Sequence, residues 1–244
     1  MQQSILKNMA CASCPIKHRA VCSRCDADEL ALLESIKTYK SFSANDQILW
    51  RGEELHYVAS VVEGVATLGK SLEDGRTQMV GLLLPSDFIG HPGRTHIEFD
   101  VVAASDVTLC CFEREPFRKL INDVPHLAQR MVEIALDELD AARDWMVLLG
   151  RKTAGEKIAT FIEMVTRRQH LDRADGQQTD LVLPLLRSEI ANYLGLTLET
   201  VSRQLTILKS ESVLEFVDKR HFRILDMARL HDATGDDADG GILA

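Results

Sequence analysis

The spacing of apolar positions changes along the 244-residue chain. Residues 27–36 carry apolar side chains at helical spacing, which predicts a short amphipathic helix. From about Ser41 to Phe117, short apolar runs alternate with turn residues, and the pair Asp74 and Gly75 is typical of a β-hairpin turn. Short strands at this pitch predict a small β-barrel or jelly roll, with strands at Tyr57–Val62, Val65–Leu68, Met79–Leu84 and Val101–Phe112.

A long helical pattern begins at Pro125 and continues to about Leu149. Its apolar positions step alternately by three and four residues, which is the spacing of a coiled-coil seam. A second apolar line on the same helix, from Met131 to Leu148, can cover the barrel of its own chain. Because both faces need a partner, we predict that the seam joins two subunits through Val132, Ala135, Leu139, Ala142, Met146 and Leu149.

The pattern predicts a small helical domain over residues 151–230, with its first helix at 154–168 and a short β segment near its end. Residues 170–180 are polar and predict a loop. Residues 231–244 contain four Asp and no Lys or Arg, and are expected to form a disordered acidic tail. Residues 150–230 carry 13 Lys and Arg against 11 Asp and Glu, although the whole chain has a net charge of −9. A weakly basic domain is compatible with DNA binding.

Within this domain, residues 186–209 have the pattern of a helix-turn-helix. Ser188 is expected to cap the first helix, Gly195 to end it, and Thr197 to cap the second helix. The second helix presents side chains of base-reading types, which favours recognition in the major groove over a helix pair without DNA function. The candidate base-contacting residues are Glu199, Ser202 and Arg203.

Six cysteines fall into an N-terminal group and an adjacent pair, Cys110 and Cys111. In a reducing compartment such clustering indicates metal or redox chemistry rather than structural disulfides. Thiolates are soft ligands that suit an iron–sulfur cluster or zinc. Two CxxC pairs, taken alone, favour a structural zinc site, and they are formed by Cys11 with Cys14 and by Cys22 with Cys25.

The helix GLTLETVSR at residues 195–203 resembles the recognition helix of the cyclic-AMP receptor and fumarate–nitrate regulator family, Crp–Fnr. Glycines of that family's β-roll have counterparts at Gly52, Gly64 and Gly90, and LPSDFIG (84–90) is similar to the strand that leads to its small-molecule pocket. The N-terminal CASCPIKHRAVC is similar to the oxygen-sensing Fnr branch of alphaproteobacteria. The resemblance therefore runs over nearly the whole chain.

The resemblance implies an oxygen- or redox-responsive transcription regulator that binds a palindrome of TTGAT-type half-sites as a homodimer. Its expected partners are double-stranded DNA and RNA polymerase, and its expected cofactor is a 4Fe–4S cluster that oxygen dismantles. The implied fold is α+β: a cysteine-rich cluster-binding segment (1–26), a β-roll like the cyclic-nucleotide-binding jelly roll (27–124), a long dimerisation helix (125–150) and a winged helix-turn-helix (151–230).

By the same resemblance, three N-terminal cysteines and one distant cysteine hold the cluster. Adjacent residues of a strand point to opposite faces, so only one of Cys110 and Cys111 can face the N-terminal segment. Aligning Leu120 and Pro125 with the family without gaps selects Cys110, whereas a shift of one residue would select Cys111. Cys25 is then not a ligand, and the expected ligands are Cys11, Cys14, Cys22 and Cys110.

Two alternatives follow from the sequence: a Crp-like regulator with a structural zinc or a small-molecule effector, and a metal or electron-transfer protein without DNA function. A cyclic-nucleotide pocket needs a carboxylate where His91 stands, and Arg94 with Thr95 only weakly imitates the phosphate-binding pair. An enzyme is not expected, because the sequence has no nucleophile–base arrangement and no phosphate loop. The sequence has no membrane-spanning run and no secretion signal, which predicts a cytoplasmic protein.

Overall fold

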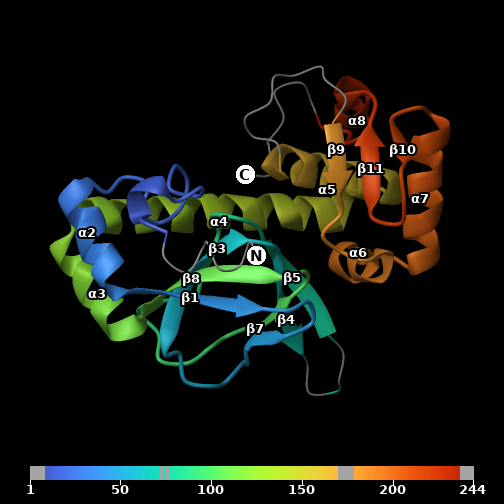
Figure 1. Ribbon diagram of the computed structural model, residues 1–244. Helices are drawn as coiled ribbons and strands as arrows, with labels where there is room; N and C mark the ends of the chain where they lie inside the picture. The colour runs from blue at the N-terminus through green and yellow to red at the C-terminus, as the bar shows by residue number, and fades with distance from the viewer. Residues whose placement is uncertain (1–8, 72–73, 75–76, 170–178, 237–244) are drawn as a thin grey trace. The chain divides into compact units, whose positions relative to one another are not determined.

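Figure 1 shows the computed structural model, which describes residues 9–71, 74, 77–169 and 179–236. Its contacts divide into two compact units, Met1–Leu136 and Asp137–Ala244. The limit between the units falls within the long helix α4 (Pro125–Arg151). None of the helices in the described ranges is both long and apolar enough to cross a lipid bilayer.

The first unit is built on two antiparallel four-stranded sheets, in the orders β1–β8–β3–β6 and β2–β7–β4–β5. This arrangement confirms the predicted β-roll. The two sheets enclose a continuous apolar core to which nearly every strand contributes. The strands are β1 (Lys37–Phe42), β2 (Gln47–Leu49), β3 (Tyr57–Glu63), β4 (Ala66–Ser71), β5 (Thr77–Leu83), β6 (Phe88–Ile89), β7 (Asp100–Ala103) and β8 (Val107–Glu113).

The sheets begin earlier and are more divided than the sequence pattern indicates. β1 begins at Lys37 rather than near Ser41, because helix α2 (Ala27–Ile36), which has the predicted bounds, ends directly before it. The run Val101–Phe112 forms two strands, since residues 104–106 bend between β7 and β8. The expected hairpin turn includes Gly75, which lies outside the described residues, and β4 pairs with β5 on either side of it.

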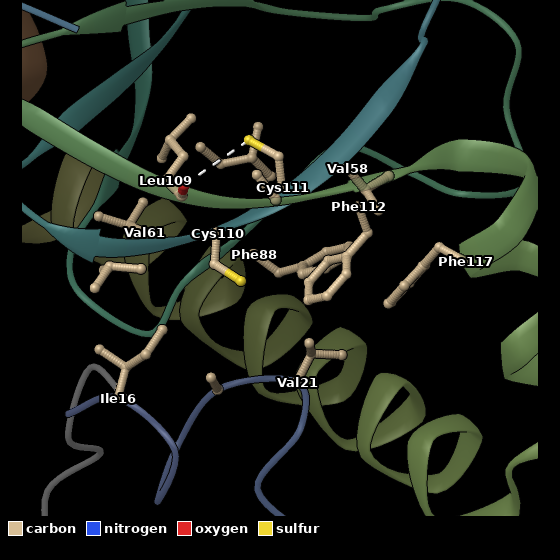
Figure 2. Close-up of a cluster of buried hydrophobic side chains, with 14 of the residues drawn as sticks. Ile16, Val21, Val58, Val61, Phe88, Leu109, Cys110, Cys111, Phe112 and Phe117 are labelled. Atoms are coloured by element: carbon tan, nitrogen blue, oxygen red, sulfur yellow. Dashed lines mark hydrogen bonds between the residues drawn. The ribbon is translucent and has the colours of Figure 1, made fainter. Parts of the chain in front are cut away.

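Helix α3 (Arg114–Asp123) has no counterpart in the sequence prediction. Phe117 is buried, Leu120 and Ile121 pack against the same core, and with Val124 they recur at helical spacing, so the sequence carried a helical pattern that the prediction missed. The Phe117 ring stacks on Phe112 and Phe88 with centroid distances of 5.1 and 5.6 Å, which fixes α3 against the first sheet (Figure 2).

Helix α4 matches the predicted helix and extends it by two residues to Arg151. The second unit continues as a winged helix-turn-helix, with a three-stranded sheet in the order β10–β11–β9. β9 lies at the end of the stretch expected to be a loop, of which residues 170–178 lie outside the described residues. The elements are α5 (Ala154–Gln169), β9 (Thr179–Val182), α6 (Arg187–Leu194), α7 (Leu198–Ser210), β10 (Leu214–Phe216), β11 (His221–Ile224) and α8 (Met227–Asp232).

The expectation of a disordered tail from residue 231 is wrong for its first six residues. Helix α8 continues to Asp232, and Thr234 is fully buried. The Asp236 carboxylate pairs with Lys152 Nζ at 2.6 Å, and Lys152 lies between helices α4 and α5. Residues 237–244 lie outside the described residues. The prediction rested on the acidic composition of this segment. It was wrong here because Asp236 has a specific cationic partner, Lys152, far away in the sequence.

Two glycines offer a matched test of the β-roll turns. Gly64 and Gly52 both have positive φ, +83° and +88°, which favours glycine. A Cβ at Gly64 would collide with the backbone carbonyl of Asp106, whereas a Cβ at Gly52 would meet no atom within 4 Å. Gly52→Ala should cost about 1–2 kcal/mol from backbone strain. Gly64→Ala should cost about 1–3 kcal/mol more, because the backbone must also move. Chemical denaturation of both variants measures this difference, and equal costs would contradict the close approach at Gly64.

Candidate functional site

The helix-turn-helix is shaped by one cap and one glycine. Thr197 Oγ1 accepts a hydrogen bond from Thr200 N at 3.2 Å and caps α7, and Gly195 ends α6 with φ +63°. Both features agree with the sequence prediction. Ser188, however, lies inside α6 and does not cap it. The Glu189 carboxylate takes that role by accepting from Leu186 N at 2.6 Å.

The predicted reading residues lie on the solvent side of α7. Glu199 and Arg203 are exposed, and Ser202 is half-buried. The opposite side of the helix packs into the domain through the buried residues Val201, Leu205 and Leu208. Helix α7 can therefore offer polar side chains from its N-terminal half to a DNA groove.

Sequence reasoning missed Arg187, which begins α6. Its Nη1 donates to Ser202 Oγ at 3.4 Å, and its guanidinium lies 5.5 Å from the centre of the Phe216 ring in β10. Lys209 Nζ lies 5.1 Å from the centre of the same ring. The position of Arg187 at a helix start was visible in the sequence, but its contact with Ser202 depends on how α6 and α7 cross.

The wing between β10 and β11 is held by Asp218. Its carboxylate accepts from the backbone N of Arg220 and of His221, both at 2.8 Å, and pairs with the His221 side chain. The His221 contact first, and then these amides, lower the pKa of Asp218 to about 2. Lys219 remains exposed between the strands, where a cation can meet a phosphate.

The N-terminal cysteines lie in a loop that is fastened to the β-roll. A short 3₁₀ helix, η1 (Cys11–Ser13), begins the loop, and backbone hydrogen bonds such as Ala20 N to Ile16 O at 2.9 Å fold it. Ile16, Ala20 and Val21 are buried in the core of the first unit. The loop thus has a fixed position against the sheet that contains β8.

Cys110 and Cys111 point to opposite faces of β8. Figure 2 shows the Cys110 side chain directed to the side on which Ile16 and Val21 lie, and the Cys111 side chain directed away from it. The Cys111 sulfur lies 4.0 Å from the carbonyl oxygen of Leu109. The cysteine expected to be the distant ligand therefore shares a face with the N-terminal loop.

The electrostatics of the thiols agree with this arrangement. Burial raises the pKa of the Cys110 thiol, and the nearby Cys11, Cys14 and Cys22 raise it further. Burial raises the pKa of Cys22 to about 11, again with contributions from Cys14 and Cys11. The four predicted ligands are therefore electrostatic neighbours.

The two other cysteines also lie near predicted ligands. Burial raises the pKa of Cys111 to about 12, with Lys40 acting against the shift, and Cys111 in turn contributes to the raised pKa of Cys110. Burial raises the pKa of Cys25 to about 12, with further contributions from Glu29, Cys22, Asp26 and Cys11. Cys25 is 7% exposed and packs in the same apolar core as Ala20 and Val21.

The thiols are not gathered around one point. A tetrahedral zinc with Zn–S bonds of about 2.3 Å would bring its sulfurs to roughly 3.8 Å from one another. Among the described residues, the one group of three ligand side chains within 4.8 Å is Asp26, Glu29 and His126, and it contains no cysteine. Its contacts are the cap of α2 and an ion pair of Glu29 with His126 at 2.9 Å. No three cysteine sulfurs of the described residues lie within 4.8 Å of one another.

The segment that corresponds to a nucleotide pocket also lacks a free phosphate-binding arginine. Arg94 pairs with Glu98 at 3.3 Å in an exposed position. His91, at the place where nucleotide binders have a carboxylate, accepts from Gly93 N at 3.1 Å. This segment therefore offers no acidic group to a ribose at that position.

The two apolar lines of α4 differ in burial. All six predicted seam residues are exposed in this single chain, and Val132 and Met146 reach 60% and 69%. The second line is half-buried or buried, and Leu148 is only 1% exposed. The exposed seam residues are Val132, Ala135, Leu139, Ala142, Met146 and Leu149.

A β-roll, a long helix with an exposed apolar seam and a winged helix-turn-helix together define a class: two-domain, DNA-binding transcription regulators. Comparison with known proteins agrees. Residues 39–124 match the cyclic nucleotide-binding domain, and residues 156–233 match the Crp-like helix-turn-helix domain.

Relatives along the whole chain narrow this class. The transcriptional activator protein FnrL of Cereibacter sphaeroides is 54% identical over 235 residues, which cover 95% of this chain and 94% of that protein. The nitrogen fixation regulation protein FixK of Bradyrhizobium diazoefficiens is 40% identical over 90% of this chain and 92% of that one. The chain belongs to the Crp–Fnr family of transcription regulators, as its sequence motifs predict.

Solved structures confirm the fold. The structure of FixK2 from Bradyrhizobium japonicum is 33% identical, with a TM-score of 0.75, and covers 83% of this chain and 100% of that chain. CooA from Carboxydothermus hydrogenoformans, at 23% identity and a TM-score of 0.66 over 84% of this chain and 90% of that chain, shares the fold.

The exposed face of α7 yields a prediction on DNA reading. Arg203→Ala should weaken binding to the preferred site by about 1–3 kcal/mol and relax the preference at one base position, since a bidentate contact to guanine is lost. Thr206→Ala, one turn further along the same helix, should leave the preference unchanged. A binding selection with a randomised site measures both. An unchanged preference for the Arg203 variant would remove this residue from the reading set.

Proposed function

We propose that this regulator is an oxygen-responsive activator of transcription, controlled by a 4Fe–4S cluster that Cys11, Cys14, Cys22 and Cys110 hold. The observation that carries the proposal is the direction of Cys110, which faces the N-terminal loop while Cys111 faces away. The donor set fits, because four thiolates are the usual ligands of such a cluster. When bound, the cluster supplies a redox-active centre that oxygen can dismantle.

The resemblance of CASCPIKHRAVC to the oxygen-sensing Fnr branch supports a cluster over zinc. His91, at the place where nucleotide binders have a carboxylate, argues against a cyclic-nucleotide effector. The loop and Cys110 thus form the sensor in this proposal.

A path from the sensor to the seam runs through α4. Arg24 Nε donates to Glu133 Oε2 at 2.8 Å, and Arg130 Nη2 donates to the carbonyl oxygen of Arg19 at 2.8 Å. Arg24 and Arg19 lie in the cysteine loop, and Glu133 is next to Val132 of the seam. A change in the loop therefore acts directly on the helix turn that begins the seam.

The exposed seam supports a homodimer. Contiguous apolar surface at heptad spacing is stabilised when a second copy of the helix covers it. An acidic residue beside the seam, Asp140, is paired with Arg143 at 2.8 Å, which reduces its repulsion across such an interface. The dimer axis then presents two α7 helices to a palindrome of TTGAT-type half-sites.

The activator role comes from the named relatives. FnrL of Cereibacter sphaeroides is described as a transcriptional activator protein, and this chain is 54% identical to it. As an activator, this protein is expected to contact RNA polymerase as well as DNA.

One experiment tests the whole proposal. The protein purified without oxygen should be brown and bind a TTGAT palindrome, and exposure to air should remove both the colour and the DNA binding.

The neighbouring cysteines of β8 provide a matched pair of variants. Cys110→Ser should abolish the iron–sulfur chromophore after anaerobic reconstitution, because one iron loses its thiolate. Cys111→Ser, at an equally buried position, should retain it. Iron and sulfide analysis with absorbance spectra measures both. The reverse result would move the ligand to Cys111, and zinc lost on Cys25→Ser alone would replace the cluster by a zinc site.

The seam also has a matched pair. Leu139→Glu places a charge in the predicted interface and should give a monomer at micromolar concentration, because a carboxylate cannot be buried there without a partner. Val147→Glu changes a residue on the same helix that is 54% exposed but lies outside the seam, and it should leave the dimer intact. Sedimentation velocity distinguishes the two. A dimeric Leu139 variant would contradict the seam.

A further inference from the structure

Lys37 is nearly buried, and its ammonium group donates a hydrogen bond to Cys11, the first cysteine of the loop. Its side chain is only 9% exposed, although lysine is rarely found inside a protein. Nζ donates to the carbonyl oxygen of Met9 at 2.6 Å, to Cys11 Sγ at 3.4 Å and to Glu34 Oε1 at 3.2 Å. An ammonium group has three hydrogens, and three acceptors surround it.

Glu34 also contacts Cys11, through the cysteine's backbone. Its second oxygen, Oε2, accepts from the backbone N of Cys11 at 3.3 Å. The pair of Glu34 and Lys37 thus contacts both the main chain and the sulfur of Cys11. Glu34 lies in the last turn of α2, and Lys37 is the first residue of β1, so both belong to regular elements with fixed positions.

The charge of Lys37 matters because a cysteine that binds a cluster must be a thiolate. A thiolate that binds iron is negative, and its hydrogen bonds and surrounding charge tune a cluster's stability and redox properties. Lys37 places a positive charge and a hydrogen-bond donor beside Cys11, and the carboxylate of Glu34 on the same ammonium partly offsets the charge. The other cation of the same strand, Lys40, acts on Cys111 instead.

We propose that Lys37 is a positioning residue of the oxygen sensor: with Glu34 it orients Cys11, and by its own hydrogen bond to the sulfur it stabilises the thiolate, and so sets how firmly the cluster is retained. This inference rests on the proposed cluster function. It assigns a role to a residue outside the cysteine motif, on the strand that pairs with β8 and its Cys110.

The test uses the full-length protein, reconstituted anaerobically with iron and sulfide. Lys37→Met removes the charge and the donors but keeps most of the side-chain volume. We expect iron transfer to a ferrous chelator without oxygen to become roughly 10-fold faster, and bleaching of the absorbance in air to accelerate in the same direction. Lys37→Arg, which retains the charge, should restore most of the retention.

Lys40→Met is the matched control. Lys40 lies on the same strand, is exposed, and has its ammonium 3.5 Å from the centre of the Tyr57 ring rather than near the N-terminal loop. This variant should release iron at the wild-type rate. Circular dichroism of the cluster-free proteins checks folding, and Lys37→Gln replaces Lys37→Met if the latter does not fold.

The outcomes separate the two proposals. Wild-type protein that takes up no iron and sulfide would overturn the cluster function itself. Wild-type protein that forms the cluster, with equal release rates for the Lys37→Met and Lys40→Met variants, would leave the function standing and overturn the role of Lys37. Faster release from the Lys37→Met variant alone supports the inference.

Discussion

The pleat of β8 is the constraint on which the sensor depends. Consecutive side chains of a strand alternate between the two faces of the sheet, so the adjacent Cys110 and Cys111 cannot serve the same site. β8 is held between β1 and β3, with Cys110 opposite Tyr39 and Ser60, and this double pairing fixes the register. A slip of one residue would exchange the two cysteines and also turn Phe112 away from Phe117. The aromatic stack and the thiol direction are therefore set by one register.

Helix α4 carries two apolar lines with different partners. Its buried line packs within the chain, and its exposed line has the spacing that suits a second helix of the same kind. The cysteine loop reaches the helix through Arg24 and Arg130, both of which meet Glu133. The cysteine loop can therefore affect the start of the dimer seam, because Glu133 is next to Val132, the first residue of that seam.

The fold could be predicted from the sequence where the pattern is local. The bounds of α2, the length of α4, the glycine at residue 195 and the cap at Thr197 all follow from spacing and local chemistry. Helix α3 has a local signal as well, because Phe117, Leu120 and Ile121 stand at helical spacing, and the prediction missed it. The ordered residues 231–236 could not be predicted in this way, because Asp236 pairs with Lys152, more than eighty residues away.

The same limit applies to the candidate site. Motif spacing and family resemblance identify the cysteines and the outward face of α7, but not Lys37, Glu34 or Arg187. Those three act through contacts that form only after strands and helices have packed. Ser188 shows the opposite error, since a suitable residue type stood near the helix start while Glu189 supplied the cap. Local chemistry suggests which residue can cap a helix, whereas backbone geometry decides which one does.

The contact between Arg187 and Ser202 has a consequence for how the recognition surface can change. The hydroxyl of Ser202 is held by a guanidinium from the preceding helix, which also rests on the Phe216 ring of the wing sheet. The base preference at the position that Ser202 faces then depends on Arg187 as well as on Ser202. A regulator that acquires a new operator sequence by replacing residue 202 also removes an acceptor from Arg187 and frees its guanidinium to turn toward the DNA, so the two positions are expected to covary as promoters diverge.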